Sequence, residues 1–164
     1  MKTLILFAHT FWENSKVNKA LLESVQGLPN LTIENLTLTC PNATIDVNAQ
    51  KSLLKDADTI IFQFPLFWFS TPSLLKEWQD RVLTGILYGD DPKMLNGKTF
   101  GIVTTAGGAE SSYDGHHGAT IKDIFVPIYH SFSYLGTKPK EAFCIFSADA
   151  SNLPIDKYKA YLGV

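Results

Sequence analysis

Cysteine, charge of one sign and long apolar runs are all scarce in this chain of 164 residues. Its two cysteines, Cys40 and Cys144, have no CxxC spacing, so we expect reduced structural thiols rather than a redox pair or a zinc site. Fourteen basic and sixteen acidic residues give a net charge of −2, which provides no electrostatic basis for binding nucleic acid or an anionic membrane. A small ligand suits this charge balance better.

Membrane spans and several catalytic signatures are also missing. Gln63 and Pro65 interrupt the longest apolar run, and the stretch Leu4–Ala8 is too short for a signal peptide, so we expect a soluble, cytoplasmic protein. The chain has no G-x-S-x-G elbow, no G-x-x-x-x-G-K-[ST] loop, and no Cys followed by the Arg-bearing loop of a phosphatase. These absences argue against hydrolase, nucleotide triphosphatase and phosphatase chemistry.

The hydrophobic content of 45%, without an internal repeat or a linker, predicts a single domain over residues 1–164. Strand-like and helix-like patterns alternate along it. We expect strands at 2–8, 31–38, 58–64, 99–105 and 141–147. Helices are expected to start at Ser15, at Val47, at Thr71-Pro72 and at 119. The last of them runs to 135, with Pro127 in a first turn or at a kink. This alternation predicts a three-layer α/β/α sandwich on a five-stranded parallel sheet, order 2-1-3-4-5.

The strongest functional signal lies between the third strand and the helix that follows it. Pro65 cannot donate to a ladder and ends the strand, and Thr71-Pro72 has the pattern of an N-cap and a first helical position. Residues 65–70 therefore form a loop at the carboxyl edge of the sheet, where ligands bind in open α/β folds. The aromatic run Phe67–Phe69 is either core or cover for a flat ligand ring. Three consecutive aromatics cannot all face one side, so we expect at least one to be exposed or covered by ligand.

Two more loops reach the same edge. The first precedes a helix whose free N–H groups suit a phosphate, with His9, Ser15 and Asn18 as donors, although Ser15 taken alone fits an ordinary N-cap better. In the second, Gly107-Gly108 either lets the backbone approach a ligand closely or provides a positive φ.

Beyond these glycines, Tyr113 and His117 are able to donate hydrogen bonds or to shuttle a proton near neutral pH. Asp114, His116 and His117 raise the alternative of a metal site. We disfavour it, because adjacent side chains diverge and neither an HxxxH motif nor a second cluster is present.

Three segments carry a family resemblance: FAHTFWENSKVNKALLE, FQFPLFWFSTPSLLKEWQDRVL and TTAGGAESSYDGHHG. Through them the chain resembles the flavodoxin-fold NAD(P)H:quinone oxidoreductases, including the ancillary quinone reductases of potassium-efflux systems. The resemblance implies a flavodoxin-like fold, a homodimer with the site at the subunit interface, a possible transporter partner, and two-electron reduction of quinones by ping-pong hydride transfer from NADPH or NADH through a flavin. It implies FMN rather than FAD, because the sequence ends at Val164 without the C-terminal extension of the longer enzymes.

The resemblance also implies a role for individual residues. The first loop would hold the flavin phosphate, the middle and third loops the ring, and the two residues beyond them would stabilise charge on the reduced flavin. The positions for the phosphate are His9, Ser15, Val17 and Asn18. Those for the ring are Pro65, Leu66, Phe67, Trp68 and Phe69 in the middle loop and Thr104, Thr105, Ala106 and Gly107 in the third. The two residues that would stabilise charge are Tyr113, which also contacts the flavin, and His117.

The sequence departs from the family pattern at three places. Phe67 stands where relatives often carry a polar residue such as Gln, so a side-chain contact to the flavin edge is missing while backbone contacts remain. Ala106 stands where Gly is common. The spacing from Tyr113 to His117 is shorter than in the mammalian members, which weakens the role of His117 more than that of Tyr113.

Two other functions remain open at this point. One is a non-enzymatic regulatory subunit that binds flavin or nucleotide for a transporter, and the other is a one-electron flavodoxin carrier. Flavodoxins bind phosphate with a Thr/Ser/Gly-rich loop and are strongly acidic, whereas this loop reads HTFWENS and the net charge is only −2. The carrier is therefore the weaker alternative.

Overall fold

The chain, described over residues 1–164 in a computed structural model, is built on a parallel β-sheet. The strands follow one another in the order β2-β1-β3-β4-β5, and β6 also pairs with β4. Every pairing is parallel, so the predicted order 2-1-3-4-5 is confirmed. The strands are β1 (Thr3–Phe7), β2 (Leu31–Asn35), β3 (Thr59–Pro65), β4 (Thr99–Thr105), β5 (Lys138–Pro139) and β6 (Phe143–Ile145).

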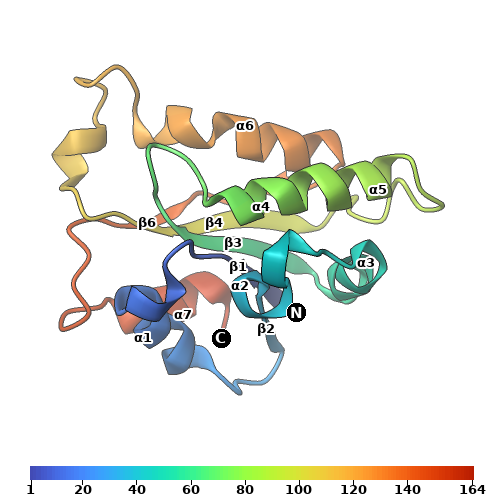
Figure 1. Cartoon of the computed structure of the whole chain (residues 1–164), viewed down its shortest axis with the longest axis horizontal. Coiled ribbons are helices and arrows are strands. Elements are labelled where there is room, and N and C mark those ends of the chain that lie inside the picture. The colour runs from blue at the N-terminus through green and yellow to red at the C-terminus, as the bar shows by residue number, and fades with distance from the viewer.

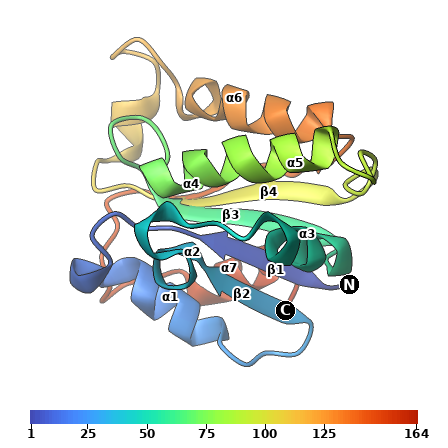
Figure 2. The same cartoon turned by 45° about the vertical axis from the view of Figure 1, so that its right-hand side comes forward.

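Helices cover both faces of this sheet (Figures 1 and 2). One layer holds α4, α5 and α6, and the other holds α1 and α7. The helices are α1 (Val17–Val25), α2 (Leu36–Thr39), α3 (Val47–Asp56), α4 (Ser73–Trp78), α5 (Thr84–Leu87), α6 (Ile121–Tyr134) and α7 (Ile155–Leu162); a π-helical turn, η3 (Gln79–Leu83), joins α4 to α5, and short 3₁₀ turns lie at η1 (Trp12–Asn14), η2 (Pro41–Ala43) and η4 (Glu110–Tyr113). None of these helices is both long and apolar enough to cross a membrane.

The central strand β3 supplies side chains to both layers, because successive residues of a strand point to opposite faces. Phe62 faces the layer of α4 to α6, where it packs against Trp78 at a ring distance of 5.4 Å. Ile61 belongs to the smaller cluster with α1 and α7. Every residue of β3 is buried, which explains why its sequence is almost continuously apolar rather than alternating.

The edge strand expected at 31–38 is too long. β2 ends at Asn35, and the next four residues form the single turn α2. The reason is tertiary: the Thr37 hydroxyl accepts a hydrogen bond from the His9 N–H and donates to the His9 carbonyl, which holds this segment over the end of β1. A local alternation of residues does not reveal such a contact.

Two helix starts differ from the sequence-based expectation. α1 begins at Val17 and not at Ser15, since the preceding residues form η1 and Lys16 is the N-cap. α4 begins at Ser73, and Pro72 rather than Thr71 is its N-cap; the Pro72 carbonyl accepts from the backbone of the first turn. The Thr71 hydroxyl makes no capping bond.

The end of the chain holds the remaining differences. The strand expected at 141–147 is the shorter β6, and β5, which precedes it, was not expected; the two pair with opposite ends of β4. The helix α7 was not expected at all, yet it packs against α1 and buries Tyr158 and Leu162. The helix expected over 119–135 is α6, which keeps Pro127 in its interior and has Thr120 as N-cap.

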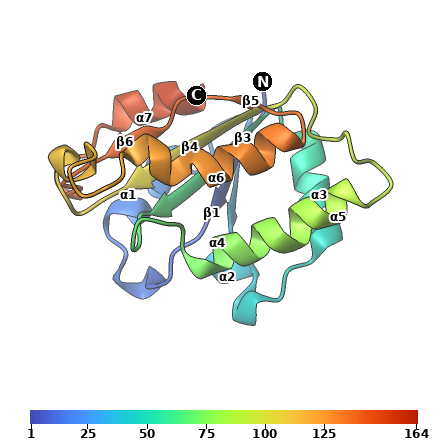
Figure 3. The same cartoon turned by 90° about the horizontal axis from the view of Figure 1, so that it is seen from above.

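This arrangement brings three loops to one end of the molecule. β1, β3 and β4 run side by side, and the segments that leave their carboxyl ends gather at the left of Figure 1 and again at the left of Figure 3. They are the loop before α1, the loop between β3 and α4, and the loop between β4 and α6. The edge predicted to bind a ligand is therefore a real junction of distant segments.

Candidate functional site

The loop after β3 folds into a tight two-residue turn. Phe67 and Ser70 exchange both backbone hydrogen bonds, at 3.0 and 2.9 Å, and leave Trp68 and Phe69 at the tip. Both tip residues have positive φ, 47° and 58°. Such a turn normally takes Asn-Gly, because bulky side chains are strained in this region at a cost of roughly 1–3 kcal/mol each. Strained backbone of this kind is typical of functional sites.

The tip residues are exposed, as expected for at least one member of the aromatic run. Trp68 is 95% exposed and Phe69 is 54% exposed. Phe67 is half-buried and packs edge-on against His9 at 5.6 Å and against Phe11 at 5.8 Å. The aromatic turn is thus joined to the loop that follows β1.

His9 is fixed from several directions. Its backbone bonds to Thr37, and its Nδ1 accepts a hydrogen bond of 2.9 Å from the Phe11 N–H. Burial, and secondarily the charge of Lys19, lower the pKa of His9 below its ordinary value. The imidazole is therefore neutral at pH 7, and its Nε2–H is the tautomeric position left to donate.

Ser15 lies at the start of α1 with its hydroxyl buried. The residue is 7% exposed, and its Oγ has no hydrogen-bond partner. The backbone N–H groups of Val17, Asn18 and Lys19 likewise have no acceptor, as at any helix N-terminus without a side-chain cap. A buried hydroxyl without a partner is costly, and here it stands beside free donors and a positive helix dipole. This set of groups is complementary to an anion.

The predicted residues at the ends of β3 and β4 lie side by side. Pro65 pairs in register with Thr105, whose carbonyl accepts from the Leu66 N–H at 2.9 Å. The Thr104 hydroxyl donates to the Phe64 carbonyl at 2.9 Å and so is directed into the sheet. These contacts hold the aromatic turn against the end of β4.

The glycine pair after β4 has an open backbone. Neither Gly107 nor Gly108 has a positive φ, so the turn alternative raised by the sequence is wrong. A Cβ built on Gly107 would meet no atom within 4 Å, whereas one on Gly108 would come within 3.3 Å of the Tyr113 hydroxyl. The Ala106 N–H is already bonded to the Ile145 carbonyl. Gly107 is the position of this loop that leaves room for another molecule.

Of the two residues beyond the glycines, the structure brings only one to the site. The Tyr113 ring lies 6.1 Å from Phe69 and 5.5 Å from Phe146. His117 is exposed, and its one aromatic contact is with the neighbouring His116. With the altered spacing of this loop, Tyr113 still contacts the aromatic turn, whereas the one aromatic contact of His117 is with His116.

The acidic and histidine residues of the same loop pair with each other. His116 Nδ1 lies 2.5 Å from a carboxylate oxygen of Asp114, and the hydrogen bonds from His116 hold the pKa of that carboxyl below its usual value. The structure contains no group of three or more His, Cys, Asp or Glu side chains placed to bind a metal ion.

Two polar residues beneath the loops were not identified from the sequence. Gln63 on β3 is fully buried, and its Nε2 donates to Asn18 Oδ1 at 3.2 Å. Asn18 Nδ2 in turn donates to Thr105 Oγ1 at 2.9 Å. Tyr158 on α7, also fully buried, donates to Gln63 Oε1 at 2.6 Å. The signal was available, since a Gln inside a strand buried on both faces requires partners.

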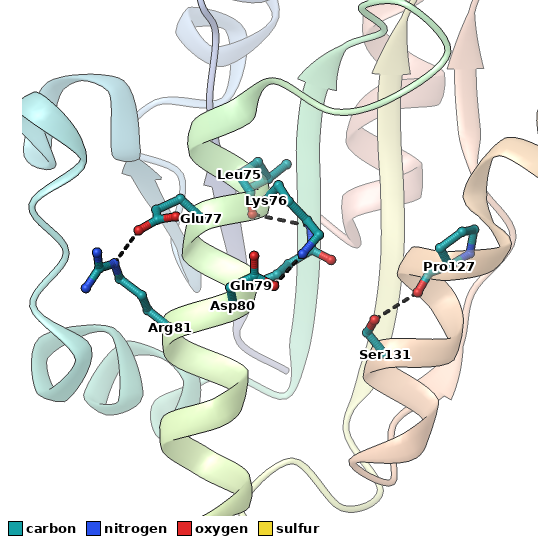
Figure 4. A network of polar contacts seen from close by, with 8 residues as sticks. All are labelled: Leu75, Lys76, Glu77, Gln79, Asp80, Arg81, Pro127 and Ser131. Atoms are coloured by element: carbon teal, nitrogen blue, oxygen red, sulfur yellow. Dashed lines mark hydrogen bonds and ion pairs between the residues drawn. The ribbon is translucent and has the colours of Figure 1, made fainter.

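A hollow of about 840 Å³ lies elsewhere, between the α4–η3 segment and α6. Figure 4 shows polar contacts at its walls, each of them between residues of the same helical segment. Lys76 pairs with Asp80, and the Ser131 hydroxyl donates to the Pro127 carbonyl at 2.8 Å. Gln79 Nε2 donates to the Leu75 carbonyl at 3.3 Å. None of the buried polar atoms that lack a partner belongs to its lining, so this hollow is a weaker candidate than the edge at Ser15.

Known proteins share this arrangement. Residues 1–162 match the family described as having a flavodoxin-like fold. The chain belongs to this family. A Bacillus subtilis relative named as an uncharacterized NAD(P)H oxidoreductase is 37% identical over 146 residues, 87% of this chain and 84% of the relative. The ancillary protein KefG of a glutathione-regulated potassium-efflux system in Cronobacter sakazakii is 41% identical over 129 residues, 77% of this chain and 70% of KefG.

Solved structures of the family superpose closely on the chain. General stress protein 14 of Treponema denticola, solved in complex with FMN, has a TM-score of 0.88 at 29% identity and covers 99% of this chain and 97% of its own. An NADPH-quinone reductase from P. pentosaceus has a TM-score of 0.83 at 27% identity, with coverage of 99% and 94%.

The strained turn makes a prediction about stability. Replacing the tip by Asn-Gly, through Trp68→Asn with Phe69→Gly, removes two bulky side chains from positive φ and puts the preferred residues there. We expect the cofactor-free variant to be more stable by about 1–3 kcal/mol in urea denaturation. Trp68→Ala is the control: it keeps the φ strain and removes an exposed side chain, so its effect stays within about 0.5 kcal/mol. A double variant no more stable than this control would show that the turn is not strained in solution.

Proposed function

We propose that this chain is a flavin-dependent NAD(P)H:quinone oxidoreductase that carries FMN at the edge formed by the loops after β1, β3 and β4. The observation that carries the proposal is the buried, unpartnered Ser15 hydroxyl beside the free N–H groups of the first turn of α1. A phosphate ester satisfies all of these donors at once. A relative solved with FMN and relatives named as NAD(P)H oxidoreductases are consistent with it.

The rest of the site suits a flat ring. Gly107 presents open backbone after β4, and the Trp68–Phe69 tip provides an exposed aromatic surface after β3. His9 has a neutral imidazole with one N–H to donate. We assign FMN over FAD, because this one set of donors accounts for a single phosphate group.

When bound, the flavin would supply the capacity to accept a hydride from NADPH or NADH and to pass two electrons to a quinone. The protein positions the reactants and stabilises charge. The first turn of α1 and Ser15 bind the phosphate, and the Gly107 N–H is free to donate to a ring oxygen that gains negative charge. The Tyr113 hydroxyl lies next to Gly108 and provides a second donor for that charge. The chain's exposed Trp68 offers the quinone a flat surface.

The assembly of the chain and a possible regulatory role belong to the same proposal. The exposed aromatic tip and the half-exposed site are consistent with a homodimer in which a second copy completes the cover. The 41% identity to KefG favours one alternative, a regulatory role beside a transporter. A regulator would bind FMN without steady-state turnover. We place the enzyme first, because the open Gly107 and exposed Trp68 leave room for a substrate as well as a cofactor.

The visible spectrum of the purified protein tests the proposal directly. We expect reconstitution with FMN to give the oxidised flavin bands, bleaching by NADPH under anaerobic conditions, and recovery on adding a quinone. Steady-state NADPH oxidation with the quinone should follow. Bound FMN without turnover would support the regulatory alternative, and failure to take up FMN would overturn both.

Gly107→Ala separates cofactor binding from folding. Because the added methyl group meets no protein atom within 4 Å and φ is not positive, we expect the stability of the cofactor-free protein to change by less than about 0.5 kcal/mol. The same methyl group occupies the space for the ring, so FMN affinity should fall by tenfold or more, on the order of 1.4 kcal/mol. Unchanged affinity in a fluorescence titration would remove Gly107 from the site.

Tyr113→Phe tests the proposed charge stabilisation. Loss of the hydroxyl should leave FMN bound and slow hydride transfer by about 10- to 100-fold, as expected when a donor to a developing charge is removed. Stopped-flow bleaching by NADPH measures this step. The matched control is His117→Gln, which we expect to react at the wild-type rate because His117 is exposed and its one aromatic contact is with His116. Equal rates for wild type and Tyr113→Phe would contradict the assignment.

A further inference from the structure

Four side chains from four elements form a continuous hydrogen-bonded chain under the site: Tyr158, Gln63, Asn18 and Thr105. Each is at most 5% exposed. Water therefore does not supply the missing partners, and any donor or acceptor left over would be buried without one. A partner that the four side chains do not supply must therefore come from another protein group or from a bound molecule.

A chain of this kind has two possible directions, because each amide can be turned by 180°. In one direction the Tyr158 hydroxyl donates to Gln63, and every donor points toward Thr105. In the other, Thr105 donates inward and the Tyr158 proton has no acceptor in the chain. Tyr158 is fully buried, and burial raises its pKa above the ordinary value, so it keeps its proton. The tyrosine end therefore fixes the direction.

The direction determines which donors face the cofactor loops. Because Thr105 Oγ1 accepts from Asn18, its own proton is available to another acceptor. The Asn18 amide donates one N–H to Thr105 and has a second N–H left to donate. Asn18 lies in the first turn of α1 beside Ser15, and Thr105 ends β4 just before Gly107. The two free donors thus lie at the proposed phosphate and ring positions.

We propose that Gln63 and Tyr158 are positioning residues, which act through Asn18 and Thr105 to hold two donors toward the anionic cofactor. Both residues are fully buried, so neither presents a surface to the cofactor itself. The inference rests on the proposed function, since the donors are directed to FMN. It extends the site to α7, an element on the opposite side of the sheet from the aromatic turn's helix.

The test compares Tyr158→Phe with Tyr161→Phe. The control removes another hydroxyl from the same helix, one that is buried but takes no part in the chain. Dissociation constants for FMN and for riboflavin, which lacks the phosphate, are measured by fluorescence titration of the whole protein. We expect Tyr158→Phe to weaken FMN binding about tenfold, in line with a hydrogen bond to a charged group, and to reduce the preference for FMN over riboflavin. Tyr161→Phe should keep the wild-type preference.

A general loss of stability would weaken the binding of both ligands equally and leave the ratio of their dissociation constants unchanged. An unchanged ratio in Tyr158→Phe would therefore overturn the inference. If Tyr158→Phe does not fold, Gln63→Met removes the middle of the chain at similar volume and should give the same loss of preference. The side-chain amide NMR signals of Gln63 and Asn18 provide a readout without flavin: both should shift in Tyr158→Phe and stay in place in Tyr161→Phe. Wild-type protein that binds neither ligand would count against the proposed function instead, while the amide signals would still test the chain.

Discussion

The parallel pairing of β3 with β1 and β4, buried on both faces, is the constraint on which the structure depends. It aligns Phe7, Gln63 and Val103 in one register, so the three strands end at nearly the same level. Parallel strands joined by crossovers must leave the sheet at this one edge. Three segments far apart in sequence are thereby brought together without any contact that is specific to a ligand.

At this edge the chain departs from the rules that it follows elsewhere. Trp68 and Phe69 occupy positive φ, and the Ser15 hydroxyl is buried without a partner. Each feature costs stability and neither improves the core. Native proteins retain such destabilising features where a function requires them. Because the two features come from separate loops at the same edge of the sheet, a shared ligand explains them better than two independent accidents of packing.

Sequence patterns predicted the parts of the fold that depend on local burial. The strand at Thr99–Thr105 was located to the residue, because its ends are marked by Gly97 and by the glycine pair. The end of β2 was misplaced, because it depends on the contact of Thr37 with His9 in the loop after β1. α7 was missed although its buried residues have helical spacing and Gly163 adopts the left-handed conformation of a C-cap.

The same distinction applies to the site. The strand pattern placed the three loops at one edge and the resemblance gave their residues roles, but only the three-dimensional structure separates Tyr113, which contacts Phe69, from His117, whose one aromatic contact is with His116. Gln63 shows why. In the sequence it interrupts an apolar run, and a leucine there would fold without needing partners. Burying an amide requires Tyr158 and Asn18 to satisfy it, at a cost that an apolar core avoids. A polar chain that runs from α7 through the central strand to the ends of α1 and β4 is therefore better explained by the direction that it gives to donors at the site than by any gain in stability.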